Sequence, residues 1–114
     1  MSLDQLAAVV TIAEERSMVR AARRLHISQP PLTRKLLALE EELGVRLFAR
    51  NARGMTLTPA GEAFAGEAMA ILAAVARAAA IARRGQAEPP AQVGDVEREL
   101  VPARGGTASD RPTA

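Results

Sequence analysis

The chain has 114 residues and a formal net charge of +2, with 48% hydrophobic and only 2% aromatic residues. This length allows one small domain. The chain has no cysteine, so disulfides and thiolate metal sites are excluded and a reducing cytoplasm is the simplest compartment. No run approaches ~20 uncharged apolar residues, and Asp4 interrupts the N-terminal segment, so we expect neither a membrane span nor a signal peptide.

Charge is distributed unevenly along the chain. Residues 1–84 carry 12 Lys and Arg against 8 Asp and Glu, whereas residues 85–114 carry 3 against 5. The first part therefore favours a polyanionic partner, and the second part does not.

Two helices are predicted before residue 26. Helical spacing of apolar residues predicts a first helix from Leu3 to Glu15, whose inward residues are Leu3, Leu6, Val9, Val10 and Ala13. Ser17 can cap a second helix, from about Met18 to Leu25, with Ala22 and Leu25 facing inward.

A third helix is predicted to begin after Ser28, although it contains two adjacent prolines. With Ser28 as N-cap, Pro30 and Pro31 fall in the first turn, where backbone N–H groups have no intrahelical partner. The helix ends near Gly44, and its predicted buried stripe consists of Leu32, Leu36, Leu39 and Leu43. We expect the acidic residues 40–42 to form a solvated patch that can pair with nearby arginines.

A hairpin and a long helix are predicted to follow. Val45, Leu47, Met55 and Leu57 flank a polar tip at residues 50–54, which indicates a short two-stranded hairpin. Thr58 and Pro59 begin a helix that runs to about residue 84. Residues 85–114 are rich in Pro, Gly and Ala and are predicted to be disordered. The expected organisation is therefore a domain over residues 1–58, a helix over 59–84 and a tail over 85–114.

This order of elements is the plan of a mainly α, winged helix-turn-helix domain. The face of the third helix away from its leucines offers Arg, Thr and Gln side chains that suit the edges of bases in a major groove. Serines at two helix starts can hold phosphates, and arginines of the hairpin can reach an adjacent minor groove. The candidate DNA-binding residues are Ser17, Ser28, Gln29, Pro30, Thr33, Arg34, Arg50 and Arg53.

Plainer interpretations exist for several of these residues. The polar face of the third helix is also what a solvated surface looks like, and Arg53 is equally explained as an exposed turn residue. His26 is the only histidine, so a zinc site lacks a second ligand of suitable spacing. Ser17 and Ser28 lack a base with an acidic partner, so we expect no enzyme activity, no metal and no cofactor.

The long helix is predicted to form a homodimer. At ~1.5 Å per residue it extends about 39 Å, more than a three-helix body can cover. An exposed apolar stripe of that length implies a partner helix. The predicted dimerisation residues are Phe64, Ala68, Ile71, Leu72, Val75, Ala78 and Ala82.

The segment "AARRLHISQPPLTRKLLALEEELGVRLFARNARGMTLTPAGEAF" closely resembles the N-terminal DNA-binding domain of LysR-type transcriptional regulators. The resemblance covers residues 1 to about 84. It implies that the third helix is the recognition helix and that Gln29, Pro30, Thr33 and Arg34 contact bases. It also implies that Arg53 approaches the minor groove and that residues 59–84 are a dimerising linker helix.

The chain departs from the family pattern at several positions. Thr33 stands where the family usually has Ser, Arg16 where Gly is common, and Leu37 and Ala38 where residues are frequently polar or basic. The family chain continues into an effector-binding domain, which the thirty residues after residue 84 are too few to build, so we expect no small-molecule effector site here.

Three hypotheses follow for a cytoplasmic, nucleoid-associated prokaryotic protein. The leading one is a dimeric regulator that reads an inverted-repeat operator in duplex DNA. The second is an interaction protein that forms mixed dimers with a full-length relative through the long helix. The third is a truncated or frame-shifted remnant without function.

Overall fold

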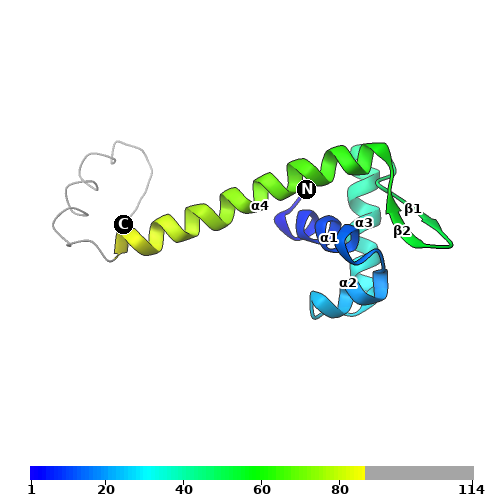
Figure 1. Cartoon of the computed structure of the whole chain (residues 1–114), viewed down its shortest axis with the longest axis horizontal. Helices are drawn as coiled ribbons and strands as arrows, with labels where there is room; N and C mark the ends of the chain where they lie inside the picture. The colour runs from blue at the N-terminus through cyan, green and yellow to red at the C-terminus, as the bar shows by residue number, and fades with distance from the viewer. Residues whose placement is uncertain (87–114) are drawn as a thin grey trace. The chain divides into compact units, whose positions relative to one another are not determined.

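The computed structural model describes residues 1–86 and confirms the mainly α class with one hairpin (Figure 1). In chain order its elements are α1 (Leu3–Glu15), α2 (Met18–Arg24), α3 (Gln29–Leu43), β1 (Phe48–Asn51), β2 (Gly54–Leu57) and α4 (Pro59–Gln86). The last helix was expected to run to about residue 84, and α4 extends two residues further, to Gln86. The rest of the predicted tail, from residue 87 on, lies outside the described residues.

The chain divides into two compact units, Met1–Ala76 and Arg77–Ala114. The first unit contains α1, α2, α3, the hairpin and the first part of α4. Of the second unit, the structure describes the helical residues 77–86. The boundaries expected after residues 58 and 84 stay predictions.

The helix starts follow their local capping signals. Ser2 caps α1 in a reciprocal arrangement with Gln5, and the Ser17 hydroxyl accepts a hydrogen bond from the Arg20 N–H at the start of α2. Pro30 and Pro31 stand in the first turn of α3, as predicted. Ser28 has the extended backbone of an N-cap, but its side chain makes no capping hydrogen bond.

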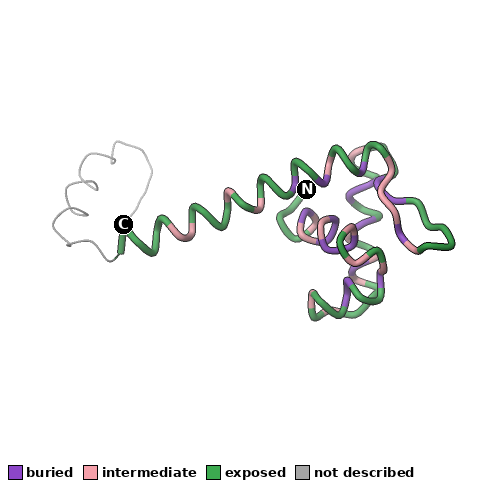
Figure 2. The backbone as a smooth tube through the Cα atoms, viewed as in Figure 1, coloured by how far each residue is buried: buried purple, intermediate pink, exposed green. Residues whose placement is uncertain are grey.

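The core of the first unit lies between α1, α2 and α3, with contributions from the hairpin (Figure 2). Leu32, Leu36 and Leu39 are buried, which confirms the leucine stripe, and Leu43 is half-buried at its end. On α1 the prediction is wrong at Leu3, which is 47% exposed, whereas Ile12 is fully buried. Val9 is fully buried and marks the buried face of α1. Leu3 lies about 120° away from it around the helix and therefore falls outside that face.

The expected solvated patch at residues 40–42 is wrong at Glu40. Only 7% of this residue is exposed, and its carboxylate accepts hydrogen bonds from the N–H groups of Leu47 (2.7 Å) and Phe48 (3.3 Å). Arg46 lies 3.8 Å from the same carboxylate. Because the chain turns back beside the last turn of α3, Glu40 joins α3 to the hairpin. Glu42 is exposed and pairs with the N-terminal ammonium at 2.9 Å.

The hairpin has a tighter tip than the sequence suggested. Its antiparallel register runs from Phe48 opposite Leu57 to Asn51 opposite Gly54, which leaves only residues 52 and 53 in the turn. The predicted tip of residues 50–54 is therefore too long. Backbone pairing extends up to the turn because Gly54 adopts a φ of +103°, which side chains disfavour.

The start of α4 is held against the segment before β1. The Thr58 N–H donates to the Leu47 carbonyl (3.0 Å), and the Thr58 hydroxyl donates to the Arg46 carbonyl (2.7 Å). The same hydroxyl accepts from the Gly61 N–H at 2.9 Å, so Thr58 caps α4 as predicted. Gly61 is buried at this junction.

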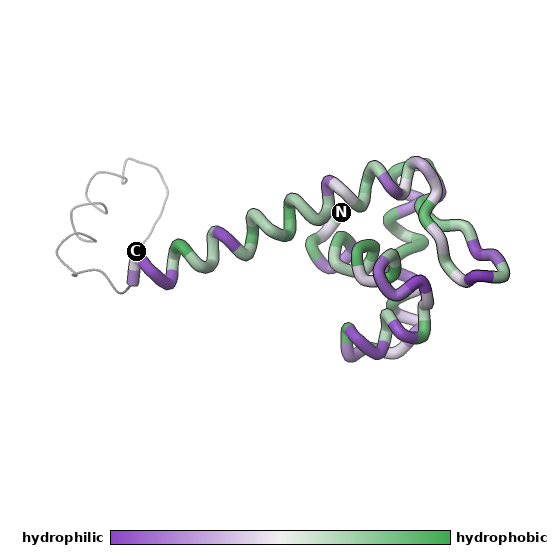
Figure 3. Tube along the Cα trace, in the orientation of Figure 1, coloured by the Kyte–Doolittle hydropathy of each residue, from purple (hydrophilic) through white to green (hydrophobic). Residues whose placement is uncertain are grey.

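Helix α4 is unusually apolar for an exposed helix (Figure 3). Met69, Ile71 and Val75 are 54%, 43% and 43% exposed, respectively. We expected no membrane span, yet by length and composition alone this helix is long and apolar enough to cross a membrane. Glu67 and Arg77 interrupt its apolar residues, and a helix that packs against a protein partner meets the same criterion.

Two glycines of α4 provide a matched test of the junction. A Cβ on Gly61 would overlap the Leu47 carbonyl oxygen, so Gly61→Ala should lower the free energy of unfolding by about 3 kcal/mol. Gly66 has open space around it, so Gly66→Ala should raise that free energy by about 0.5–1 kcal/mol. Urea unfolding followed by circular dichroism measures both changes. Equal stability of Gly61→Ala and wild type would contradict the close approach.

Candidate nucleic-acid interface

The tip of α3 brings together the four residues predicted to contact bases. Gln29, Pro30, Thr33 and Arg34 line one open hollow at the N-terminal end of the helix. Gln29, Pro30 and Arg34 are exposed, and Thr33 is half-buried. Since the leucine stripe fixes the opposite side of α3, these side chains are presented outward from a rigid element.

The two serines predicted to hold phosphates have different surroundings. The Ser17 hydroxyl is engaged as the cap of α2, at 3.1 Å from the Arg20 backbone nitrogen. Ser28 is exposed and makes no side-chain cap, so its hydroxyl is available to an anion. Pro30 and Pro31 have no N–H, so Gln29 carries the only backbone donor among the first three residues of α3.

Both candidate arginines of the hairpin are exposed. Arg53 lies in the two-residue turn, where its backbone N–H donates to the Asn51 side chain (2.9 Å). Arg50 lies in β1 opposite Met55. The structure therefore places one candidate at the tip of the hairpin and the other on its strand.

A contact that the sequence did not reveal fixes the hairpin to the turn between α1 and α2. The Met55 N–H donates to the Arg16 carbonyl at 3.2 Å. Arg16 ends α1 with a left-handed backbone (φ 56°), and a Cβ on Gly54 would lie 2.5 Å from the Arg16 carbonyl oxygen. One indication of this turn is present in the sequence: Arg16 stands where the family commonly has Gly, the residue that favours a left-handed backbone.

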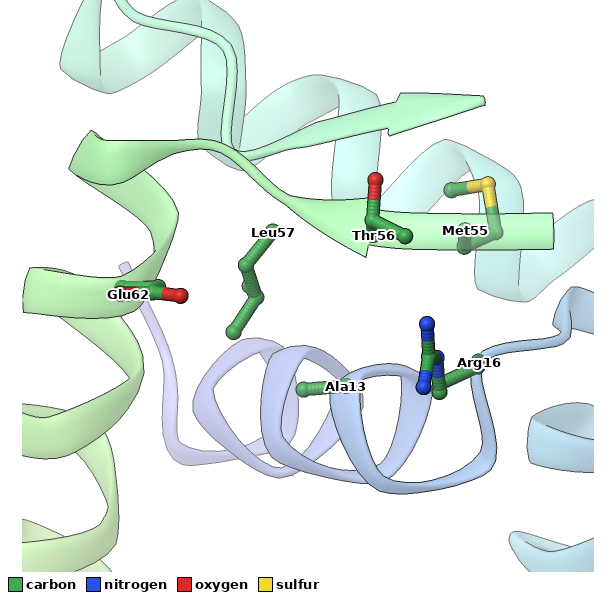
Figure 4. A pocket seen from close by; sticks show the side chains of 6 residues that line it. All are labelled: Ala13, Arg16, Met55, Thr56, Leu57 and Glu62. Carbon is green, nitrogen blue, oxygen red and sulfur yellow. The ribbon is translucent and has the colours of Figure 1, made fainter. Parts of the chain in front are cut away.

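A small hollow lies beside this contact (Figure 4). Its lining residues are Ala13, Arg16, Met55, Thr56, Leu57 and Glu62. In Figure 4 the Arg16 side chain extends from the end of α1 toward β2. The hollow thus lies between α1, β2 and the first turn of α4.

The arginines of α2 are partly neutralised by the acidic end of α1. Arg24 lies 2.7 Å from Glu14 and 3.2 Å from Glu15, and Arg20 lies 3.5 Å from Glu15. These hydrogen bonds, first that with Glu14 and then that with Glu15, raise the pKa of Arg24 above its ordinary value. Apart from these paired arginines, exposed arginines lie on α2 (Arg23), α3 (Arg34) and the hairpin (Arg50 and Arg53).

The predicted dimerisation residues fall into two groups. Ala68 is only 1% exposed, because it packs inside the Met1–Ala76 unit, and Phe64 packs partly against the same core. A partner has no access to Ala68, so its assignment is corrected. Ile71 and Val75 are exposed, Leu72 is half-buried, and Ala78 and Ala82 are exposed.

Among residues 1–86 there is no group of three or more His, Cys, Asp or Glu placed to hold a metal ion. His26 is exposed and adopts a left-handed backbone (φ 60°) after α2. This conformation explains the residue as part of the turn that precedes α3.

Three packed helices, an antiparallel hairpin and an exposed third-helix tip define a winged helix-turn-helix protein. The family described as "Bacterial regulatory helix-turn-helix protein, lysR family" matches residues 3–62, more than half of the chain. The chain belongs to this family.

Individual relatives agree with this assignment. The chain is 44% identical over 97 residues to the HTH-type transcriptional regulator TfdT of Cupriavidus pinatubonensis (strain JMP 134 / LMG 1197). This match covers 85% of the chain but 41% of TfdT, so the chain spans less than half the length of that relative.

Solved structures of similar fold include two domains in complex with DNA. The CbnR_DBD–DNA complex is 44% identical with a TM-score of 0.70, covering 75% of this chain and 99% of that one. The BenM_DBD/catB site 1 DNA complex is 37% identical with a TM-score of 0.75, and the match covers 78% of this chain and 100% of BenM_DBD.

The different surroundings of the two serines predict different stability effects. Ser17→Ala removes the cap of α2 and should lower the free energy of unfolding by about 1 kcal/mol. Ser28→Ala removes no capping bond and should change it by less than about 0.5 kcal/mol. Urea denaturation compares the two variants. A larger loss for Ser28→Ala than for Ser17→Ala would show that the caps have been assigned wrongly.

Proposed function

We propose that this chain binds duplex DNA in a sequence-specific manner, as the DNA-reading part of a LysR-type transcriptional regulator. The observation that carries the proposal is the exposed tip of α3, where Gln29, Pro30, Thr33 and Arg34 surround one hollow. The similarity of the chain to CbnR_DBD and BenM_DBD, both solved in complex with DNA, supports DNA binding by this chain as well.

In this proposal α3 enters the major groove with its N-terminus leading. Arg34 offers two parallel donors that match the acceptors of guanine, and Gln29 can both donate to and accept from adenine. Thr33 supplies a hydroxyl and a methyl group at the same edge. The Ser28 hydroxyl and the Gln29 N–H bind a phosphate, which sets the depth of the helix in the groove.

The hairpin contacts DNA beside that groove. Arg53 at the turn enters the neighbouring minor groove, whose negative potential attracts a guanidinium, and Arg50 lies nearer the phosphates. The bond between the Met55 N–H and the Arg16 carbonyl keeps the hairpin at a constant position relative to α2 and α3.

Two copies of the chain pair through α4 and read an inverted repeat. Ile71 and Val75 remain exposed after the first turns of the helix have packed on their own unit, and exposed apolar stripes of this kind mark protein interfaces. The symmetry of a homodimer matches that of two inverted half-sites. As a DNA-binding regulator it acts in the bacterial cytoplasm, at the nucleoid.

The same stripe supports a second candidate, a mixed dimer with a longer relative. The chain spans 41% of TfdT, and a similar helix in such a relative offers an equivalent surface. Size-exclusion chromatography and pull-down with a longer homologue separate the candidates. Stable homodimers that bind DNA unaided support the first, whereas DNA binding only as a mixed dimer supports the second.

Replacement of Arg34 tests the reading of bases. Arg34→Ala should lose about 1–3 kcal/mol of discrimination at one base pair of each half-site, because a bidentate contact is removed. Fluorescence anisotropy with a duplex selected from a random pool, and with its single-base variants, measures this loss.

Arg77 provides the matched control for charge, since it is exposed on α4, outside α3 and the hairpin. Arg77→Ala should leave discrimination at every base pair unchanged. If Arg34→Ala also keeps wild-type discrimination throughout the site, Arg34 does not read a base.

Replacement of Ile71 tests the dimer. Ile71→Glu places a charge on the exposed stripe and should convert dimers to monomers, since two like charges would meet at the interface. Ala73→Glu adds the same charge about 160° away around α4 and should leave the dimer intact. Sedimentation velocity measures the mass of each variant. A dimeric Ile71→Glu would exclude this face of α4 as the interface.

A further inference from the structure

One leucine of α3 has no place in the core. Leu32, Leu36 and Leu39 are at most 5% exposed, whereas Leu37 is 56% exposed in the middle of the same helix. An exposed leucine by itself needs no explanation. The position of Leu37 relative to the candidate base contacts does distinguish it.

Leu37 lies on the outward face of α3, together with the residues of the tip. At ~100° per residue it falls about 20° from Pro30 and about 60° from Arg34 around the helix. Along the axis it stands about 4.5 Å beyond Arg34, which is less than one turn. A helix that inserts Pro30 and Arg34 into the major groove therefore also turns Leu37 toward the base edges in that groove.

The far side of Leu37 shows where this face ends. Leu37, Glu41 and Val45 border a hollow between the last turns of α3 and the segment before β1. Glu41 is exposed one turn beyond Leu37, and its carboxylate repels phosphates. Leu37 is thus the last residue of this face before the carboxylate of Glu41, and the exposed Arg46 lines the same hollow.

We propose that Leu37 is a specificity-determining residue that contacts the C5-methyl group of a thymine in the major groove. Leucine has no hydrogen-bonding group, and the thymine methyl is the apolar group that the four bases display there. This inference rests on the proposed function, because it requires α3 to lie in the major groove. It assigns to an apolar side chain the base pair next to the one read by Arg34.

The experiment removes the two partners of this contact separately and together. The full chain selects its site from a pool of random duplexes, and each thymine of one half-site is then replaced singly by deoxyuridine, which lacks only the methyl group. Dissociation constants are measured for wild type, Leu37→Ala and Leu3→Ala. Leu3 is the matched control, since it is also an exposed leucine of a helix but lies on α1.

One deoxyuridine should weaken wild-type binding about fourfold, as expected for exposing a buried methyl-sized group. Leu37→Ala should bind the thymine duplex more weakly by a similar factor and should not distinguish thymine from deoxyuridine at that position. Leu3→Ala should keep the wild-type profile. Circular dichroism confirms that each variant is folded.

Several outcomes would overturn the proposal. If Leu37→Ala responds to every deoxyuridine as wild type does, Leu37 does not contact a methyl group. If Leu37→Ala becomes monomeric in sedimentation while its base preferences persist, Leu37 and Val45 belong to a contact between copies. If wild type selects no sequence at all, the proposed function fails, and the reading of thymine fails with it.

Discussion

The peptide groups of Leu47 join the parts of the domain that have to act together. The Leu47 N–H donates to the buried carboxylate of Glu40 on α3, and its carbonyl accepts from Thr58 at the start of α4. Gly61 approaches the same carbonyl so closely that it leaves no room for a side chain. Leu47 itself is fully buried. Helix α3, the hairpin and α4 therefore meet at one residue, and a shift there changes all three.

This junction explains how a small domain with almost no aromatic residues presents a rigid reading surface. Buried leucines pack one face of α3 against the core, and the Glu40 carboxylate in its last turn is hydrogen-bonded to the start of the hairpin. At its other end the hairpin is fixed by the Arg16 carbonyl. Because a side-chain carboxylate fixes one end of the hairpin and a backbone hydrogen bond fixes the other, the fold sets the distance between the tip of α3 and the hairpin turn.

Helix α4 changes its role along its length. In its first turns, the small residues Gly61, Ala65 and Ala68 are buried against the rest of the first unit. Farther on, Ile71 and Val75 are exposed, as the proposed dimer interface requires. A continuous helix can be packed at one end and exposed at the other because its backbone hydrogen bonds are made within the helix. An exposed turn therefore leaves no backbone group without a partner.

The sequence by itself determined the helices, the hairpin and the candidate tip of α3, because caps, prolines and the spacing of leucines act over a few residues. Tertiary structure decided the rest. From the sequence alone Glu40 was expected to be solvated, but the fold buries it and places two N–H groups beside its carboxylate. Leu3 was expected to be buried and is exposed, whereas Ala68 was expected to be accessible to a partner and is buried. The anchoring of the hairpin to Arg16 joins residues 39 positions apart. Such contacts leave no local pattern, since burial depends on partners that are distant in the sequence.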